Sequence, residues 1–176
     1  KQDYADFLRF HKEKGAEFSV AVMEVDWKEA SRFGLMVADE DDRITEFQEK
    51  PPVPKSNLAS MGIYIFNWDI LKKYLEEDEA DPNSKNDFGM NIIPALLRDG
   101  RKMYAYHFNG YWRDVGTIDS LWEANMEVLD PENSGIDIFD EKWKIYSRNP
   151  VLPAQKIGPR ALVQDSLVTE GCQIYG

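Results

Sequence analysis

The sequence predicts an α/β domain with a mainly parallel sheet, followed by the beginning of a second domain. Apolar, β-rich runs alternate with segments of helical periodicity as far as Asp130, which is the order typical of layered α/β proteins. After Asp130 the spacing of apolar residues has no clear helical or strand period. Branched apolar residues then recur about every sixth position, at Ile157 and Val163, with Thr169 in the same slot. This spacing resembles the hexapeptide repeat of a left-handed β-helix, of which about one coil is present.

Four helices are expected from apolar residues that recur three and four positions apart. They cover 4–14, 68–75, 88–99 and 118–129. Asn67 and Thr117 stand before the second and fourth helices and are residue types that cap helix N-termini. Asp87 or Asn91 is expected to cap the third helix. Pro94 lacks an N–H, so it must lie in the first turn of that helix or bend it.

Strands are expected where apolar residues run almost without interruption or alternate with polar ones. They include 18–26, 58–66 and 102–108. Residues 33–51 are expected to form a hairpin whose acidic turn lies at Asp41 and Asp42. The first of these strands is apolar on both faces, which predicts a central place in the sheet.

The composition excludes some classes of function. There are 32 acidic and 21 basic residues, for a net charge of −11, which argues against a nucleic-acid or membrane-surface binder. The single cysteine, Cys172, rules out a disulfide within the chain and is in keeping with a cytoplasmic protein. His11 and His107 have no metal-ligand spacing with Cys172. The chain begins without methionine, directly in helical pattern, and we expect it to be a fragment of a longer protein.

The motif "FQEKP" places Glu49 and Lys50 at the end of a predicted strand, where functional side chains are often found. Lys50 could donate to phosphate oxygens and Glu49 could accept from sugar hydroxyls. The alternative is a solvated Glu-Lys pair of little energetic weight, which the two residues alone favour.

Two further motifs combine small and polar residues. In "ASMGIYIF", Ser60 and Gly62 interrupt an apolar strand, either to let a ligand or another backbone approach closely or to relieve packing against a helix. In "NDFG", Asp87 is either the cap of the following helix or a group that holds a ligand hydroxyl at the helix N-terminus.

The stretch "YWRDVGT" places Trp112, Arg113 and Asp114 before a helix. Locally, Asp114 is best explained as a turn residue. A carboxylate is also a ligand for a hard cation such as magnesium, which proteins often hold with one or two carboxylates together with substrate phosphates. The residues alone therefore indicate only an α/β domain that binds a phosphorylated small molecule.

These motifs occur together in a family-specific order. "ASRFGLMVADEDDRITEFQEKP", "SNLASMGIYIF", "NDFGMNIIP", "YWRDVGTIDSLWEANM" and "IYSRNPVLP" follow one another along almost the whole chain. In this order the sequence resembles bacterial glucose-1-phosphate adenylyltransferase, also called ADP-glucose pyrophosphorylase. The resemblance implies a Rossmann-like nucleotidyltransferase domain followed by a left-handed β-helix. We accordingly expect the sugar-phosphate half of the catalytic domain at 1–130, a linker at 131–156 and the first β-helix coil at 157–176.

The resemblance also implies roles for individual residues. Lys50 would grip the phosphate of glucose 1-phosphate, and Asp114 would be one of two aspartates that hold Mg²⁺. These two are the expected catalytic residues. The expected substrate-binding residues are Glu49, Lys50, Ser60, Tyr64, Asp87, Phe88 and Trp112.

The implied reaction is ATP with glucose 1-phosphate to ADP-glucose and pyrophosphate, for glycogen biosynthesis, by an allosteric, homotetrameric, cytoplasmic enzyme. The family's glycine-rich nucleotide loop and its second metal aspartate are not found in the sequence, so we expect the chain alone to be inactive. Two alternatives stay open: another sugar-1-phosphate nucleotidyltransferase, acting on UDP- or dTDP-sugars, and a non-catalytic regulatory homologue.

Overall fold

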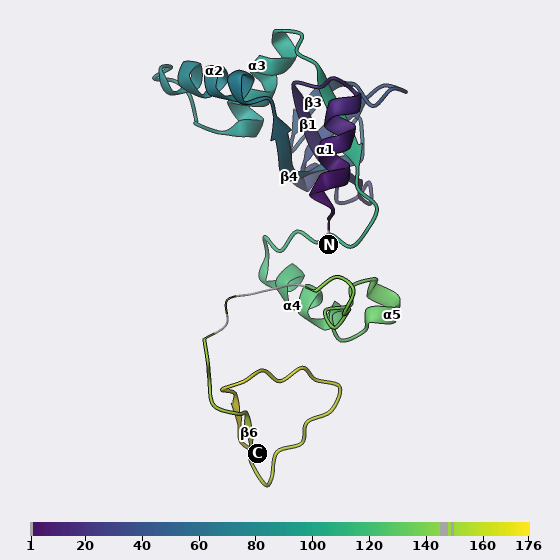
Figure 1. Cartoon of the computed structure of the whole chain (residues 1–176), viewed down its shortest axis with the longest axis vertical. Helices are drawn as coiled ribbons and strands as arrows, with labels where there is room; N and C mark the ends of the chain where they lie inside the picture. Colours follow the sequence, from purple (N-terminus) through teal and green to yellow (C-terminus); the bar gives the residue numbers. More distant parts are fainter. Residues whose placement is uncertain (1, 145–147, 149) are drawn as a thin grey trace. The chain divides into compact units, whose positions relative to one another are not determined.

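The computed structural model describes residues 2–144, 148 and 150–176, which divide into two compact units, Gln2–Asn109 and Gly110–Gly176 (Figure 1). The expected domain of residues 1–130 spans the first unit and the beginning of the second. The division into domain, linker and β-helix stays a prediction. Part of the expected linker and of the motif "IYSRNPVLP" lies outside the described residues, namely Ile145, Tyr146, Ser147 and Asn149.

The first unit is built on a five-stranded sheet with the order β3-β2-β4-β1-β5. The strands are β1 (Phe18–Glu24), β2 (Gly34–Ala38), β3 (Ile44–Glu49), β4 (Leu58–Phe66) and β5 (Met103–His107). All of the strands expected from the apolar runs are therefore present. β1 lies between β4 and β5, so its expected place inside the sheet is confirmed.

The strand directions differ in part from the expectation, although the mixed α/β class is confirmed. β1 and β5 run parallel, and β5 pairs with the edge of β1 opposite to the edge that pairs with β4. The pairs β1–β4, β2–β3 and β2–β4 are antiparallel. A parallel neighbour needs a crossover of about a dozen residues or more. The short acidic loop between Ala38 and Ile44 can only reverse the chain. Within the five-stranded sheet, as far as the structure describes it, β1–β5 is the parallel strand pair and the expected mainly parallel arrangement is not found.

The helices of the first unit begin and end close to their expected positions. They are α1 (Tyr4–Glu13), the 3₁₀ turn η1 (Ala30–Arg32), α2 (Trp68–Glu79), the π-helical turn η2 (Phe88–Ile92) and α3 (Ile93–Arg98). The single helix expected over 88–99 is therefore a π-helical turn that continues into an α-helix. Pro94 lies in the first turn of α3, as expected, directly after the π-helical turn η2.

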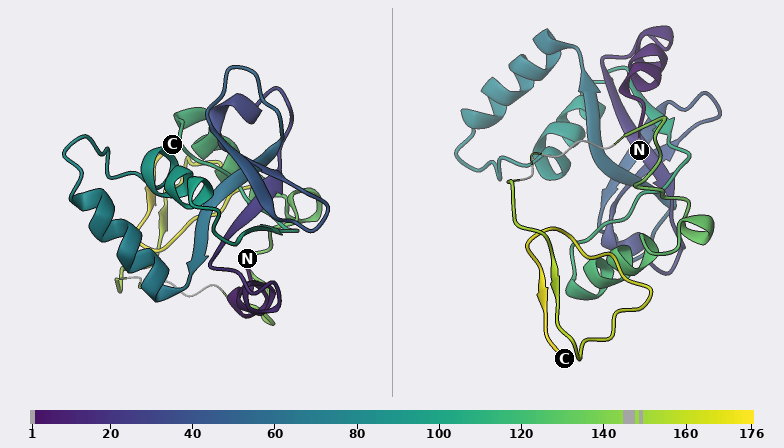
Figure 2. Two further views of the ribbon diagram at one scale, coloured as in Figure 1. Left: turned by 90° about the horizontal axis from the view of Figure 1, so that it is seen from above. Right: turned by 60° about the horizontal axis from the view of Figure 1, so that its bottom comes forward.

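Helices cover both faces of the sheet, which explains the continuous apolar run of β1. Phe18, Val20 and Val22 point to one face and belong to the main core cluster, together with residues of α2, η2 and α3 such as Leu96. Ser19 points to the other face, where it meets α1. Figure 2 shows the strands lying between α1 and the pair α2 and α3.

A polar network that is buried at His11 and Ser19 links the two helical layers. His11 of α1 contacts Ser19 Oγ of β1 through Nδ1 at 2.8 Å and Asn67 Oδ1 through Nε2 at 3.3 Å. Asn67 Nδ2 donates to the carbonyl of Ala16 at 3.2 Å. Asn67 stands at the N-cap position of α2, as expected, but its side chain makes no capping hydrogen bond because it is used here.

The second unit contains α4 (Ile118–Glu127), α5 (Pro131–Ser134), β6 (Lys156–Ile157) and β7 (Gln173–Ile174). The helix expected after Thr117 is confirmed. β6 and β7 pair in parallel, with Ile157 opposite Ile174, and Ile157 is 51% exposed. One parallel pair does not establish a β-helix, so the expected coil at 157–176 stays a prediction. None of the helices in the described ranges has the length and apolar character needed to span a membrane.

Candidate functional site

A cavity of about 370 Å³ opens in the first unit beside the bent strand β4. Its wall is formed by the ends of β2 and β3, by β4 and by the segment that begins η2. The structure brings together here five of the residues expected from the sequence to bind substrate. They are Glu49, Ser60, Tyr64, Asp87 and Phe88.

The bend in β4 shapes one side of the cavity. Val20 of β1 pairs with Tyr64 and Val22 pairs with Ser60, so β4 has more residues than its neighbour between these two points and bulges. Gly62 lies at this bulge with φ +70°, and its N–H donates to Ser60 Oγ at 3.2 Å. No atom lies within 4 Å of the place a Cβ would take, so the glycine serves the backbone conformation and not packing against a helix.

Asp87 caps η2, as the local sequence favoured. Its Oδ1 accepts a hydrogen bond from the N–H of Met90 at 2.8 Å. The same side chain lines the cavity, so the capping role and a ligand-binding role do not exclude each other. The π-helical turn that follows is a geometry often found at functional sites.

Tyr64 and Phe88 form the aromatic wall of the cavity. Their rings stack with centroids 5.5 Å apart and planes inclined by 25°. Burial raises the pKa of the Tyr64 hydroxyl, a hydrogen bond with Ser60 acts in the opposite direction, and the charges of Glu49 and Asp87 raise it further. Tyr64 is therefore a neutral phenol that can donate to a ligand oxygen.

Two glycines leave room for the Glu49 carboxylate in the cavity wall, because neither has a Cβ. A Cβ on Gly89 would lie 2.7 Å from Glu49 Oε2, and a Cβ on Gly34 would lie 3.0 Å from the same oxygen. Sequence reasoning did not assign a role to either residue, although Gly89 stands in the quoted motif "NDFG". Their role is a close approach between segments far apart in the sequence, which only the folded structure reveals.

Lys50 follows directly after β3 and is not part of the cavity wall. Its Nζ lies 3.7 Å from Glu49 Oε1, and its side chain is 66% exposed. The structure thus shows the Glu-Lys pair that the local sequence favours. An exposed pair of this kind is weak, so the ammonium can leave Glu49 for a more highly charged partner.

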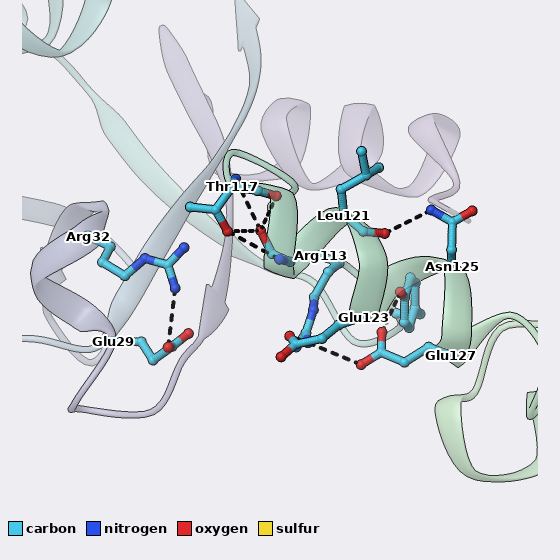
Figure 3. A network of polar contacts seen from close by, with 10 residues as sticks. Glu29, Arg32, Arg113, Thr117, Leu121, Glu123, Asn125 and Glu127 are labelled. Carbon is cyan, nitrogen blue, oxygen red and sulfur yellow. Dashed lines mark hydrogen bonds and ion pairs between the residues drawn. The ribbon is translucent and has the colours of Figure 1, made fainter.

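Trp112 and Asp114 belong to the second unit, within the stretch Tyr111–Thr117. The stretch is tied to α4 at both ends (Figure 3). Tyr111 donates to Glu127 Oε2 at 2.6 Å. Burial, together with the hydrogen bond to this carboxylate and its charge, raises the pKa of Tyr111 to about 12.

Asp114 supplies an oxygen ligand of the kind that Mg²⁺ prefers. Its carboxylate lies over Gly116, where a Cβ would come within 3.3 Å of Oδ2. In the described part of the chain, no group of three or more His, Cys, Asp or Glu side chains could hold a metal ion. A single carboxylate such as that of Asp114 could hold Mg²⁺ only together with ligands from elsewhere, such as substrate phosphates.

The first unit thus combines an α/β scaffold with a cavity lined by two carboxylates and by aromatic rings, and comparison with known proteins identifies the class. Residues 1–131 match the family model described as Nucleotidyl transferase, so the chain belongs to that family.

Several curated relatives are similar to the chain over its full 176 residues. A protein from Clostridium beijerinckii is 64% identical, one from Clostridium acetobutylicum 61% and one from Bacillus subtilis 58%. Each is named glucose-1-phosphate adenylyltransferase. The chain spans 45%, 46% and 46% of their respective lengths, so it corresponds to less than half of each relative.

Proposed function

We propose that the chain supplies the sugar-phosphate-binding part of a glucose-1-phosphate adenylyltransferase, which converts ATP and glucose 1-phosphate to ADP-glucose and pyrophosphate. The observation that carries the proposal is the cavity that gathers Glu49, Ser60, Tyr64, Asp87 and Phe88. The names of relatives at 57–64% identity support the same reaction.

The chemistry of the cavity suits a neutral, polyhydroxylated ring. The Glu49 and Asp87 carboxylates only accept hydrogen bonds, so they suit the hydroxyl donors of glucose. The Tyr64 and Phe88 rings give an apolar face for its carbon skeleton. Two carboxylates would repel the phosphate, which therefore belongs outside the cavity, near the exposed ammonium of Lys50.

The reaction requires position and charge neutralisation more than covalent chemistry. An oxygen of the glucose 1-phosphate dianion attacks the α-phosphorus of ATP. A new P–O bond forms as the bond to the β-phosphate oxygen breaks, and pyrophosphate leaves with that electron pair. No general base is needed because the attacking phosphate is already ionised. The part of Lys50 is to orient this anion, and that of the cavity is to fix the sugar behind it.

Mg²⁺ is part of the proposal, with Asp114 as the residue of this chain that would hold it. When bound, the ion would supply positive charge that offsets the repulsion of the substrate phosphates. Glycogen biosynthesis, a cytoplasmic location and a homotetrameric assembly also belong to the proposal, on the resemblance alone.

The proposal is tested in a chimaera, in which this chain replaces the matching 176 residues of the Clostridium beijerinckii relative. Pyrophosphate release is measured with glucose 1-phosphate, Mg²⁺ and either ATP, UTP or dTTP. We expect turnover with ATP, and none from the 176-residue chain alone. Preference for UTP or dTTP would instead support a different sugar nucleotidyltransferase. A folded chimaera without turnover would support the non-catalytic homologue.

Gly89→Ala is expected to weaken sugar binding without unfolding the protein. The new Cβ would meet Glu49 Oε2 at 2.7 Å, and the flexible carboxylate can move away at little cost to the fold. The loss of one charge-assisted hydrogen bond should raise the KM for glucose 1-phosphate about tenfold in the chimaera. The control is the KM for ATP of the same variant, which is expected to change much less because Gly89 lines the cavity proposed for the sugar. If Gly89→Ala left the KM for glucose 1-phosphate unchanged, the proposed role of Glu49 in sugar binding would be wrong.

A further inference from the structure

We propose that Tyr111 and Arg113 are positioning residues, which Glu123 and Glu127 of α4 hold in place so that the Asp114 carboxylate has a fixed position. The inference rests on the proposed function, since it assigns a purpose to the surroundings of the residue expected to hold Mg²⁺. All of the contacts involved lie within the second unit.

On the N-terminal side of Asp114, Glu127 contacts both Tyr111 and Arg113. Its Oε2 accepts from the Tyr111 hydroxyl at 2.6 Å, and its Oε1 lies 3.4 Å from Arg113 Nη2. Arg113 Nη2 also donates to Glu123 Oε2. Figure 3 shows Arg113 directed toward Glu123 and Glu127 on α4. The residue immediately before Asp114 is thus held by charge-assisted contacts to two successive turns of the helix.

Thr117 provides the anchor on the other side. Its Oγ1 accepts from the N–H of Ser120 at 3.2 Å, and its own N–H donates to Ser120 Oγ at 3.2 Å, which forms a reciprocal capping box. Ser120 is buried. Only three residues, from Asp114 to Gly116, lie between the two anchors, so their backbone has little freedom to move.

The charges around the loop also leave the Asp114 carboxylate available to a cation, because its neighbour Arg113 is engaged elsewhere. A guanidinium next to a carboxylate in sequence is a natural partner for it. Here Glu123 and Glu127 engage Arg113 instead. The contacts are partly exposed, with 36% of the Arg113 side chain and 32% of the Glu127 side chain accessible, so they contribute little to overall stability. Their consequence is local: they determine where the loop holds its carboxylate.

The test is Glu127→Gln, which keeps the shape of the side chain and removes the charge that both Tyr111 and Arg113 contact. The matched control is Glu29→Gln, which breaks a similar exposed pair with Arg32 at 3.2 Å, in the first unit. The first readout is amide hydrogen exchange of residues 112–116 in the 176-residue chain, without metal or substrate. We expect exchange to become about tenfold faster in Glu127→Gln and to stay unchanged in Glu29→Gln.

The second readout is the Mg²⁺ dependence of the chimaera. We expect Glu127→Gln to raise the Mg²⁺ concentration for half-maximal rate about tenfold, and excess Mg²⁺ to restore the rate. A variant damaged only in its fold would not recover in this way. Unchanged exchange at residues 112–116, or an unchanged Mg²⁺ requirement in an active chimaera, would overturn the inference. If the unsubstituted chimaera were inactive, the proposed function would fail, whereas the exchange measurement would still decide whether Glu127 orders the loop.

Discussion

Asp114→Asn is expected to reduce the rate of the chimaera at ordinary Mg²⁺ concentrations by about 100-fold. Asparagine keeps the size of the side chain and one carbonyl oxygen, but it removes the negative charge that attracts a divalent cation. A change of about 100-fold corresponds to about 3 kcal/mol of transition-state stabilisation, which is within the range of several kcal/mol that a bound metal contributes.

The measurement is pyrophosphate release at increasing Mg²⁺, with Asp119→Asn as the control. Asp119 lies in the first turn of α4, in the same unit, and is exposed. Its substitution should leave the rate and the Mg²⁺ requirement within about twofold, because a surface charge near a helix N-terminus affects mainly the helix. Full activity of Asp114→Asn at low Mg²⁺ would show that Asp114 is a turn residue, as its local sequence favoured.

Lys50→Ala is expected to raise the KM for glucose 1-phosphate about 30-fold in the chimaera, with a smaller effect on the KM for ATP. The substitution removes a cation that would face a dianion, and a hydrogen bond to a charged group is worth about 2 kcal/mol. The backbone of Lys50 has φ +42°. Alanine carries a Cβ as lysine does, so the strain of this conformation is the same in both proteins.

Lys55→Ala is the matched control for Lys50→Ala. Lys55 pairs with Glu46 at 2.7 Å, and 61% of its side chain is exposed, compared with 66% for Lys50. Both substitutions therefore remove one exposed positive charge that is paired with a glutamate of β3. If the two variants had the same KM for glucose 1-phosphate, the effect of Lys50 would be one of net charge, and its assignment to the phosphate would be wrong.

Features that depend on neighbouring residues in the sequence, such as helix caps and apolar strands, could be predicted. Thr117 and Asp87 were expected as caps from their residue types and positions, and the structure shows both capping hydrogen bonds. The apolar runs located every strand of the sheet. Strand direction was less accessible, since it depends on which strands become neighbours. The chain between β1 and β4 forms a hairpin and two antiparallel pairings, which the alternation of strands and helices does not reveal.

The candidate site was predictable to a similar extent. The order of the motifs indicated Glu49, Ser60, Tyr64, Asp87 and Phe88, and the structure places all five around one cavity. The contacts that support the site were not predictable, because they join residues without a characteristic spacing.

Arg113 and Glu127 illustrate the difficulty. Arg113 lies outside α4, so the spacing that relates charged residues within one helix does not apply to its pairing with Glu127. The function of Gly89 likewise depends on where Glu49 lies in the folded chain.

The buried contact between His11 and Ser19 has a consequence for how the first unit opens. A ten-residue helix such as α1 is too short to be stable in isolation, and its ends would ordinarily fray. Its His11, however, contacts Ser19 Oγ of β1 and also Asn67 Oδ1, and Asn67 is the residue that precedes α2. Detaching α1 from the sheet breaks both contacts of the His11 imidazole at once, the one to β1 and the one to the start of α2. The two helical layers should therefore unfold cooperatively, although they lie on opposite faces of the sheet.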